Sequence, residues 1–68
     1  MIKFDKLWVT MKEKGVSTYK LREKHGIDSV TIRRLKANKN TTTNTLSTIC
    51  EILDCKLEDI AEYVKDEV

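Results

Sequence analysis

Apolar residues recur along most of this chain at the spacing of three and four residues that is typical of amphipathic helices. The pattern predicts a first helix over residues 6–14, with Leu7 and Met11 on its apolar stripe. Asp5 is the expected N-cap, and Gly15 is the expected left-handed residue just after the helix. The first predicted element is therefore a helix that ends sharply at a glycine.

A second, shorter helix is predicted from residue 18 to about residue 24. Ser17 is a favourable N-cap, and Val16 just before it pairs with Leu21 as a hydrophobic staple. The helical pattern stops at Gly26, where the backbone freedom of glycine allows a sharp turn.

The third predicted helix, residues 29–36, begins in the same way. Asp28 is its expected N-cap, and Ile27 and Ile32 form the staple pair. Ile32 and Leu35 are three residues apart and lie on one face, which we expect to be buried. Two short helices joined by a turn of about four residues are the helix-turn-helix pattern.

Two further helices are predicted, over residues 44–53 and 57–64. The first is expected to bury Leu46, Ile49, Cys50 and Leu53, and the second Leu57, Ile60 and Val64. Lys56 is a poor N-cap for the last helix, although the acidic residues of its first turn interact favourably with the helix dipole. The predicted fold class is therefore all-α, with five helices in one compact domain over residues 1–68.

The polar residues of the third helix indicate what this domain binds. With Ile32 and Leu35 turned inward, the outer face presents Ser29, Val30, Arg33, Arg34 and Lys36, with no acidic residue among them. Arginine can form two hydrogen bonds to a guanine edge, and a small apolar side chain can contact a thymine methyl group. This face is suited to the major groove of DNA, although a basic helix that only keeps the protein soluble is the simpler alternative.

Charge is unevenly distributed along the chain. Residues 1–40 hold eleven Lys or Arg against four Asp or Glu, a net charge of +7, whereas residues 41–68 hold two against seven, a net charge of −5. A basic half joined to an acidic half indicates that one face meets a polyanion.

Other classes of function have little support in the sequence. The single histidine, His25, falls in the predicted turn without a partner at catalytic spacing, so we do not expect an enzyme. Cys50 and Cys55 are five residues apart, which fits neither a metal clip nor a redox motif, and no metal, cofactor or small-molecule site is expected. The chain has no apolar run of membrane length and no secretion signal, so we expect a cytoplasmic protein and no membrane contact.

The chain resembles the small Cro/C1-type, XRE-like helix-turn-helix regulators. Four stretches carry the resemblance over nearly the whole length: residues 17–21, 25–35, 43–55 and 57–60. The resemblance implies a compact five-helix, Cro/C1-repressor-like DNA-binding domain with the helix-turn-helix at its second and third helices. It also implies a transcriptional regulator, expected to be a repressor, of the single-domain type from Gram-positive bacteria or their mobile elements.

The resemblance also implies which residues contact double-stranded operator DNA. Base edges are expected to be contacted by Ser29, Val30 and Arg34, while Arg33 reaches either a base or a phosphate. The sugar-phosphate backbone is expected to be contacted by Ser17, Thr18, Lys36, Lys39, Asn40 and Thr41.

Two positions depart from the family pattern. Arg22 stands where a small residue usually lets the two helices of the motif approach closely, so either its long stem follows the surface or it widens the crossing of the two helices and alters how they dock on DNA. Asn38 stands where many relatives have glycine, and asparagine tolerates a left-handed backbone nearly as well.

A single recognition helix contacts too few base pairs to select a site, so we expect a weak homodimer. The expected contact surface is the C-terminal helix, through Tyr63 and Val64. The alternative function, from another class, is a protein-interaction module such as an antitoxin-like partner protein.

Overall fold

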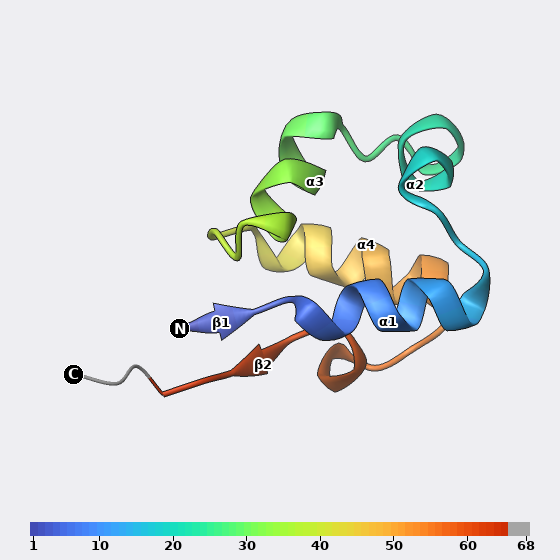
Figure 1. Ribbon diagram of the computed structural model, residues 1–68. Helices are drawn as coiled ribbons and strands as arrows, with labels where there is room; N and C mark the ends of the chain where they lie inside the picture. Colours follow the sequence, from blue (N-terminus) through green and yellow to red (C-terminus); the bar gives the residue numbers. More distant parts are fainter. Residues whose placement is uncertain (66–68) are drawn as a thin grey trace.

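A computed structural model describes residues 1–65 of the chain as a helical domain with one very small sheet (Figure 1). The elements in chain order are β1 (Ile2–Lys3), α1 (Asp5–Lys14), α2 (Thr18–His25), α3 (Ser29–Lys36), α4 (Thr43–Leu53), the 3-10 helix η1 (Leu57–Asp59) and β2 (Glu62–Tyr63). Helices α1 and α4 lie side by side, α2 and α3 lie across one side of this pair, and β1 and β2 lie at the end remote from α2.

One apolar core joins all four α-helices. Its buried members are Phe4, Leu7, Met11, Leu21, Ile27, Ile32, Leu35, Ile49, Leu53 and Ile60. Four apolar residues of the predicted helix-turn-helix are among them, namely Leu21, Ile27, Ile32 and Leu35, and Leu21 and Leu35 have no exposed surface at all. The crossing of α2 and α3 is therefore fixed by the pattern that the sequence predicts.

The caps of the helix-turn-helix are confirmed. The Ser17 hydroxyl accepts a hydrogen bond from the Lys20 N–H at 3.2 Å, and the Asp28 carboxylate accepts one from the Thr31 N–H at 2.7 Å. Gly26 adopts φ 71°, in the left-handed region where a side chain would be strained. Ser17 thus begins α2, Gly26 ends it, and Asp28 begins α3.

The two cysteines belong to the C-terminal cap of α4. Asp54 takes a left-handed conformation, and the Cys55 N–H donates to the Cys50 carbonyl at 3.1 Å, which is the 6→1 bond of a Schellman motif. That motif usually includes an apolar contact between these same two positions. Both cysteines are half-buried against the core, whereas the sequence predicts that Cys50 is buried.

The prediction of a fifth helix is wrong. Instead of a helix over residues 57–64, η1 ends at Asp59 and the chain continues into β2. Ile60 is buried as expected, but Leu57 is 55% exposed and Val64 is only half-buried. A helix of eight residues with a poor cap is marginal by itself, whereas the segment gains backbone hydrogen bonds by pairing with β1. Residues 1–65 thus form four α-helices, and the all-α class is correct except for this sheet.

The sheet joins the two ends of the described chain. β1 and β2 are antiparallel, with Ile2 opposite Tyr63 and Lys3 opposite Glu62. The Val64 N–H donates to the Met1 carbonyl at 2.8 Å. This pairing holds the segment after η1 beside the start of α1.

The start of α1 differs from the prediction by one residue. Phe4, and not Asp5, is the N-cap, and its side chain makes no capping bond. Asp5 instead lies in the first turn, where its negative charge favours the helix dipole. Further along α1, the buried Thr10 hydroxyl donates a hydrogen bond to the Asp59 carbonyl at 2.6 Å. This bond holds η1 against the helix.

Candidate nucleic-acid interface

The outer face of α3 is open to solvent along its length. Ile32 and Leu35 point into the core, and the residues between them, Arg33 and Arg34, are exposed. Val30, one turn before Arg34, has 51% of its surface exposed although it is apolar. Because half of its surface stays in water, Val30 contributes little to the apolar core, and this face is available to a partner.

The structure brings five of the predicted contact residues together. Val30, Arg33, Arg34 and Lys39 line one shallow hollow along α3, together with Ala37. Arg34, Lys39 and Asn40 line a second hollow that continues into the loop before α4. No acidic residue lines either hollow, so the two form a continuous basic surface, which we call the α3 surface.

The loop that carries Lys39 and Asn40 is anchored by the residue before it. Asn38 has φ 54°, which confirms the left-handed backbone expected at this position. Its side-chain carbonyl also accepts a hydrogen bond from the Phe4 N–H at 2.8 Å, across 34 positions of sequence. Asn38 therefore ties the end of the α3 surface to the start of α1, a role that the sequence analysis missed.

We expect Asn38→Gly to separate the two roles of Asn38. Glycine keeps the left-handed backbone but leaves the partly buried Phe4 N–H without its acceptor, at a cost of about 1–3 kcal/mol in the free energy of unfolding. Denaturant unfolding measures this cost. A variant as stable as the parent chain would show that only the backbone conformation matters at Asn38.

Asp28 places a negative charge at the start of the basic helix. Hydrogen bonds from the Thr31 side chain and backbone hold the pKa of the Asp28 carboxyl below its usual value, and the nearby charge of Arg34 acts in the same direction. The carboxylate form is thus favoured by folding. It caps α3 and lies within electrostatic reach of a candidate base-contacting arginine.

This shift gives the α3 cap a defined pH dependence. Because the folded-state pKa is lowered, the stabilisation by Asp28 is present above the ordinary carboxyl pKa and is lost as the pH falls through the lowered value. We expect Asp28→Ser, which keeps a capping oxygen, to be less stable than the parent chain at neutral pH, with the difference shrinking in acid. Unfolding of both chains across this range tests it, and a difference that grows in acid would contradict it.

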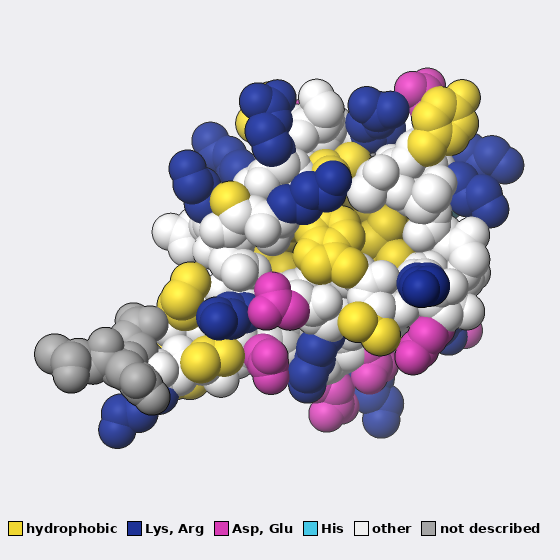
Figure 2. Space-filling view, viewed as in Figure 1, with side chains coloured by type: hydrophobic (Ala, Val, Ile, Leu, Met, Phe, Trp, Pro, Cys, Tyr) yellow, Lys and Arg dark blue, Asp and Glu magenta, His cyan; other side chains and the backbone are white. Residues whose placement is uncertain are grey.

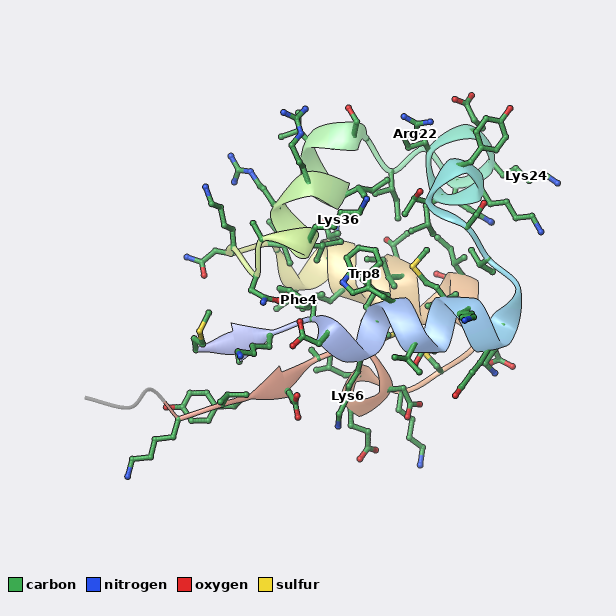
Figure 3. The ribbon with its side chains drawn as sticks, in the orientation of Figure 1. Phe4, Lys6, Trp8, Arg22, Lys24 and Lys36 are labelled. Carbon is green, nitrogen blue, oxygen red and sulfur yellow. The ribbon has the colours of Figure 1, made fainter. Side chains whose placement is uncertain are left out.

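Lys36 lies apart from the α3 surface. Its ammonium nitrogen is 5.9 Å from the centroid of the Trp8 ring, so the side chain reaches from α3 toward α1 (Figure 3). This is the geometry of a cation–π interaction. Trp8 itself is half-buried and packs against the core.

Ser17 and Thr18 lie at the start of α2, at a separate hollow. Trp8 and residues 11, 12, 15 and 16 line this hollow with them, between α1 and α2. The Ser17 oxygen already caps the helix, but its O–H remains a donor. Free N–H groups at a helix N-terminus attract phosphate, and the contact of Ser17 and Thr18 with the DNA backbone stays a prediction.

The remaining predicted residues are not part of the two hollows on α3. Ser29 is exposed at the first turn of α3, and Thr41 is half-buried in the loop before α4. Tyr63 and Val64 lie in and after β2, at a different end of the domain from α2.

The two sides of the domain differ in charge. Figure 2 shows mainly Lys and Arg side chains over α2 and α3, whereas Asp and Glu side chains lie among further Lys or Arg side chains around α1 and η1. Arg22, the departure from the family pattern, is exposed on α2 (Figure 3). Leu21 beside it is fully buried, so Arg22 does not prevent the close packing of α2.

Other kinds of site find no support in the described residues. No helix in residues 1–65 is long and apolar enough to cross a membrane. In the same part of the chain, no group of three His, Cys, Asp or Glu is placed to hold a metal ion. Burial, and then the neighbouring Cys50, raise the pKa of the Cys55 thiol, which disfavours the reactive thiolate at neutral pH.

Comparisons with known proteins match nearly the whole chain. A family model described as a Cro/C1-type HTH DNA-binding domain matches residues 6–66. Among solved structures, the chain is similar to the crystal structure of the transcriptional regulator VanUg, form II, with a TM-score of 0.86 and 31% sequence identity over 96% of this chain and 87% of that chain. Curated protein sequences give no match.

Proposed function

This chain belongs to the Cro/C1-type family of helix-turn-helix DNA-binding domains and is a DNA-binding transcriptional regulator, and from that premise we propose that α3 enters the major groove of an operator. The observation that carries the proposal is the α3 surface. It combines an exposed valine with two arginines on one face and continues into Lys39 and Asn40.

Within the groove, the exposed residues of α3 have distinct tasks. Ser29 and Val30 lie in the first turn of α3, and Arg34 lies one turn further along the same face. We assign base edges to these three, with Arg34 donating two hydrogen bonds to a guanine and Val30 contacting a thymine methyl group. Arg33 lies beside them and reaches a base or a phosphate.

Phosphates on either side of the groove are bound by the flanking segments. Lys39, Asn40 and Thr41 contact one strand from the loop before α4, and Ser17 and Thr18 contact the other from the start of α2. Such contacts set the position of the protein on DNA without selecting a sequence. Lys36 joins them by leaving the ring of Trp8, a cation–π contact worth about 0.5–1 kcal/mol at an exposed site.

The regulator binds its operator as a weak homodimer and acts as a repressor. Two copies on a two-fold axis place their recognition helices in successive major grooves, with half-sites about 34 Å apart. Tyr63 and Val64 lie near the contact, and because they are not on α3, the α3 surface of each copy remains open to DNA.

Selection of duplexes from a random DNA pool tests this function. We expect an enriched sequence with two related half-sites, bound more tightly than unselected DNA and with an affinity that falls steeply with salt. A gel-shift assay at low salt can contradict the proposed DNA binding. If the chain binds no duplex even there, the basic surface does not serve DNA, and the protein-interaction alternative takes its place.

A further inference from the structure

We propose that the free edge of β2 pairs with β2 of a second copy of this chain, so that one sheet of four strands joins the dimer. This inference rests on the proposed function only in taking the regulator to be a homodimer. It assigns the contact between them to a strand edge and an apolar hollow, and not to the helix that the sequence predicts.

The hydrogen bonds of β2 leave one of its edges unused. The Val64 N–H donates to the Met1 carbonyl at 2.8 Å, and the Val64 carbonyl accepts from the Met1 amine at 2.6 Å. Backbone groups point to alternate sides along a strand. The N–H and carbonyl of Tyr63 therefore point away from β1, to an edge that pairs with no other strand of the described chain.

An apolar hollow lies beside this edge. Ile2, Leu57, Ala61 and Tyr63 line it, with Glu58 and Glu62 at its rim. Tyr63 is 71% exposed and Ile2 is 46% exposed. Large apolar side chains gathered at one exposed place mark an interaction surface.

The charges around the hollow fit a second copy better than a strongly charged partner. Lys6 partly neutralises the acidic rim, with its amine 3.8 Å from the Glu62 carboxylate and 3.5 Å from the Glu58 carbonyl. Lys65 follows the strand and is exposed. In an antiparallel pair about a two-fold axis, Lys65 of each copy lies toward the end of the hollow where Glu58 of the other copy stands.

Strand geometry limits the register of the pair. Residues whose backbone groups face the free edge must lie opposite one another. Among the registers that satisfy this rule, we place the two-fold axis at Tyr63, because this brings the two exposed tyrosines together and sets Ala61 opposite Lys65. Each tyrosine then covers the apolar hollow beside Ile2 of the other copy. An aromatic pair directly opposite across two strands is a favourable arrangement.

Self-association without DNA tests the pairing. In sedimentation equilibrium, we expect Tyr63→Glu to weaken dimerisation by about tenfold or more, because it sets two like charges opposite each other. Tyr19→Glu is the matched control, since Tyr19 is 63% exposed on α2 and far from β2 in the fold. Equal effects of the two changes, or no effect of Tyr63→Glu, would overturn the proposal.

Cross-linking tests the register independently of stability. Opposed residues of a hydrogen-bonded pair have Cα atoms about 5.5 Å apart, within the range that a disulfide spans. We expect Tyr63→Cys to form a disulfide-linked dimer under mild oxidation, while the parent chain, with its two native cysteines, and Tyr19→Cys do not. Cross-linking of Tyr19→Cys to the same extent would overturn the register.

DNA binding separates this proposal from the proposed function. On a single half-site, Tyr63→Glu is expected to bind like the parent chain, and on two half-sites it is expected to lose cooperativity. Cooperative binding that survives Tyr63→Glu overturns the strand pairing and leaves DNA recognition intact. If neither chain binds DNA but the cross-link still forms, the proposed function fails while the dimer stands.

Discussion

Replacing Arg34 with alanine is expected to lower specific operator binding by about 1–3 kcal/mol, the value of one good pair of arginine–guanine hydrogen bonds. Arg34 lines both hollows on α3, and Lys39, which also lines both, lacks the planar guanidinium that forms this pair of bonds. The preference for one base pair should relax at the same time. Arg34→Lys is the matched variant, because lysine keeps the charge but cannot form the planar pair of bonds.

Lys39→Ala gives the contrast that makes this prediction specific. A phosphate contact carries no sequence information, so its loss should weaken binding to every duplex equally and reduce the slope of log affinity against log salt by about 1. Affinities of the three variants for the operator and for single-base variants of it are the measurement. If Arg34→Ala and Lys39→Ala both show the same uniform loss, Arg34 does not contact a base.

Leu21→Ala is expected to have the largest effect on folding, about 2–5 kcal/mol in the free energy of unfolding. Leu21 is fully buried, and it holds α2 against the rest of the core. A chain of this length has a total stability of only about 3–10 kcal/mol. We therefore expect Leu21→Ala to be partly or wholly unfolded at physiological temperature, and its apparent DNA affinity to fall with its folded fraction.

Val9→Ala on α1 is the control for this loss. Val9 is 59% exposed, and surface changes of this kind usually alter stability by less than about 0.5 kcal/mol. Denaturant unfolding followed by circular dichroism compares the three chains. Equal stabilities of Leu21→Ala and Val9→Ala would show that Leu21 does not hold the helices together.

The elements with strong local signals are the ones that the sequence predicts correctly. Ser17, Asp28 and Gly26 act within a few residues of themselves, through caps and one left-handed turn. The fully buried positions of α2, α3 and α4 follow from helical spacing, whereas Leu46 and Cys50, predicted to be buried, are half-buried. These same signals position the α3 surface, which explains why most of its residues were found without the structure.

The remaining features depend on contacts between distant parts of the chain. The segment after η1 has the composition of a short helix, but pairing with β1 decides its conformation. Asn38 signals a turn in the sequence, and nothing local shows that its side chain accepts a bond from Phe4. Helical spacing places Lys36 on the outer side of α3, yet its long side chain reaches over the Trp8 ring.

Methylation interference on the selected operator tests most directly whether α3 contacts base edges in the major groove. Guanine N7 lies in that groove, so a methyl group there should block binding at the guanine that Arg34 contacts. For Arg34→Ala, we predict that this one guanine no longer matters while the others still do. Binding that is indifferent to N7 methylation at every guanine, or an unchanged pattern in the variant, would contradict the assignment of α3 to the major groove.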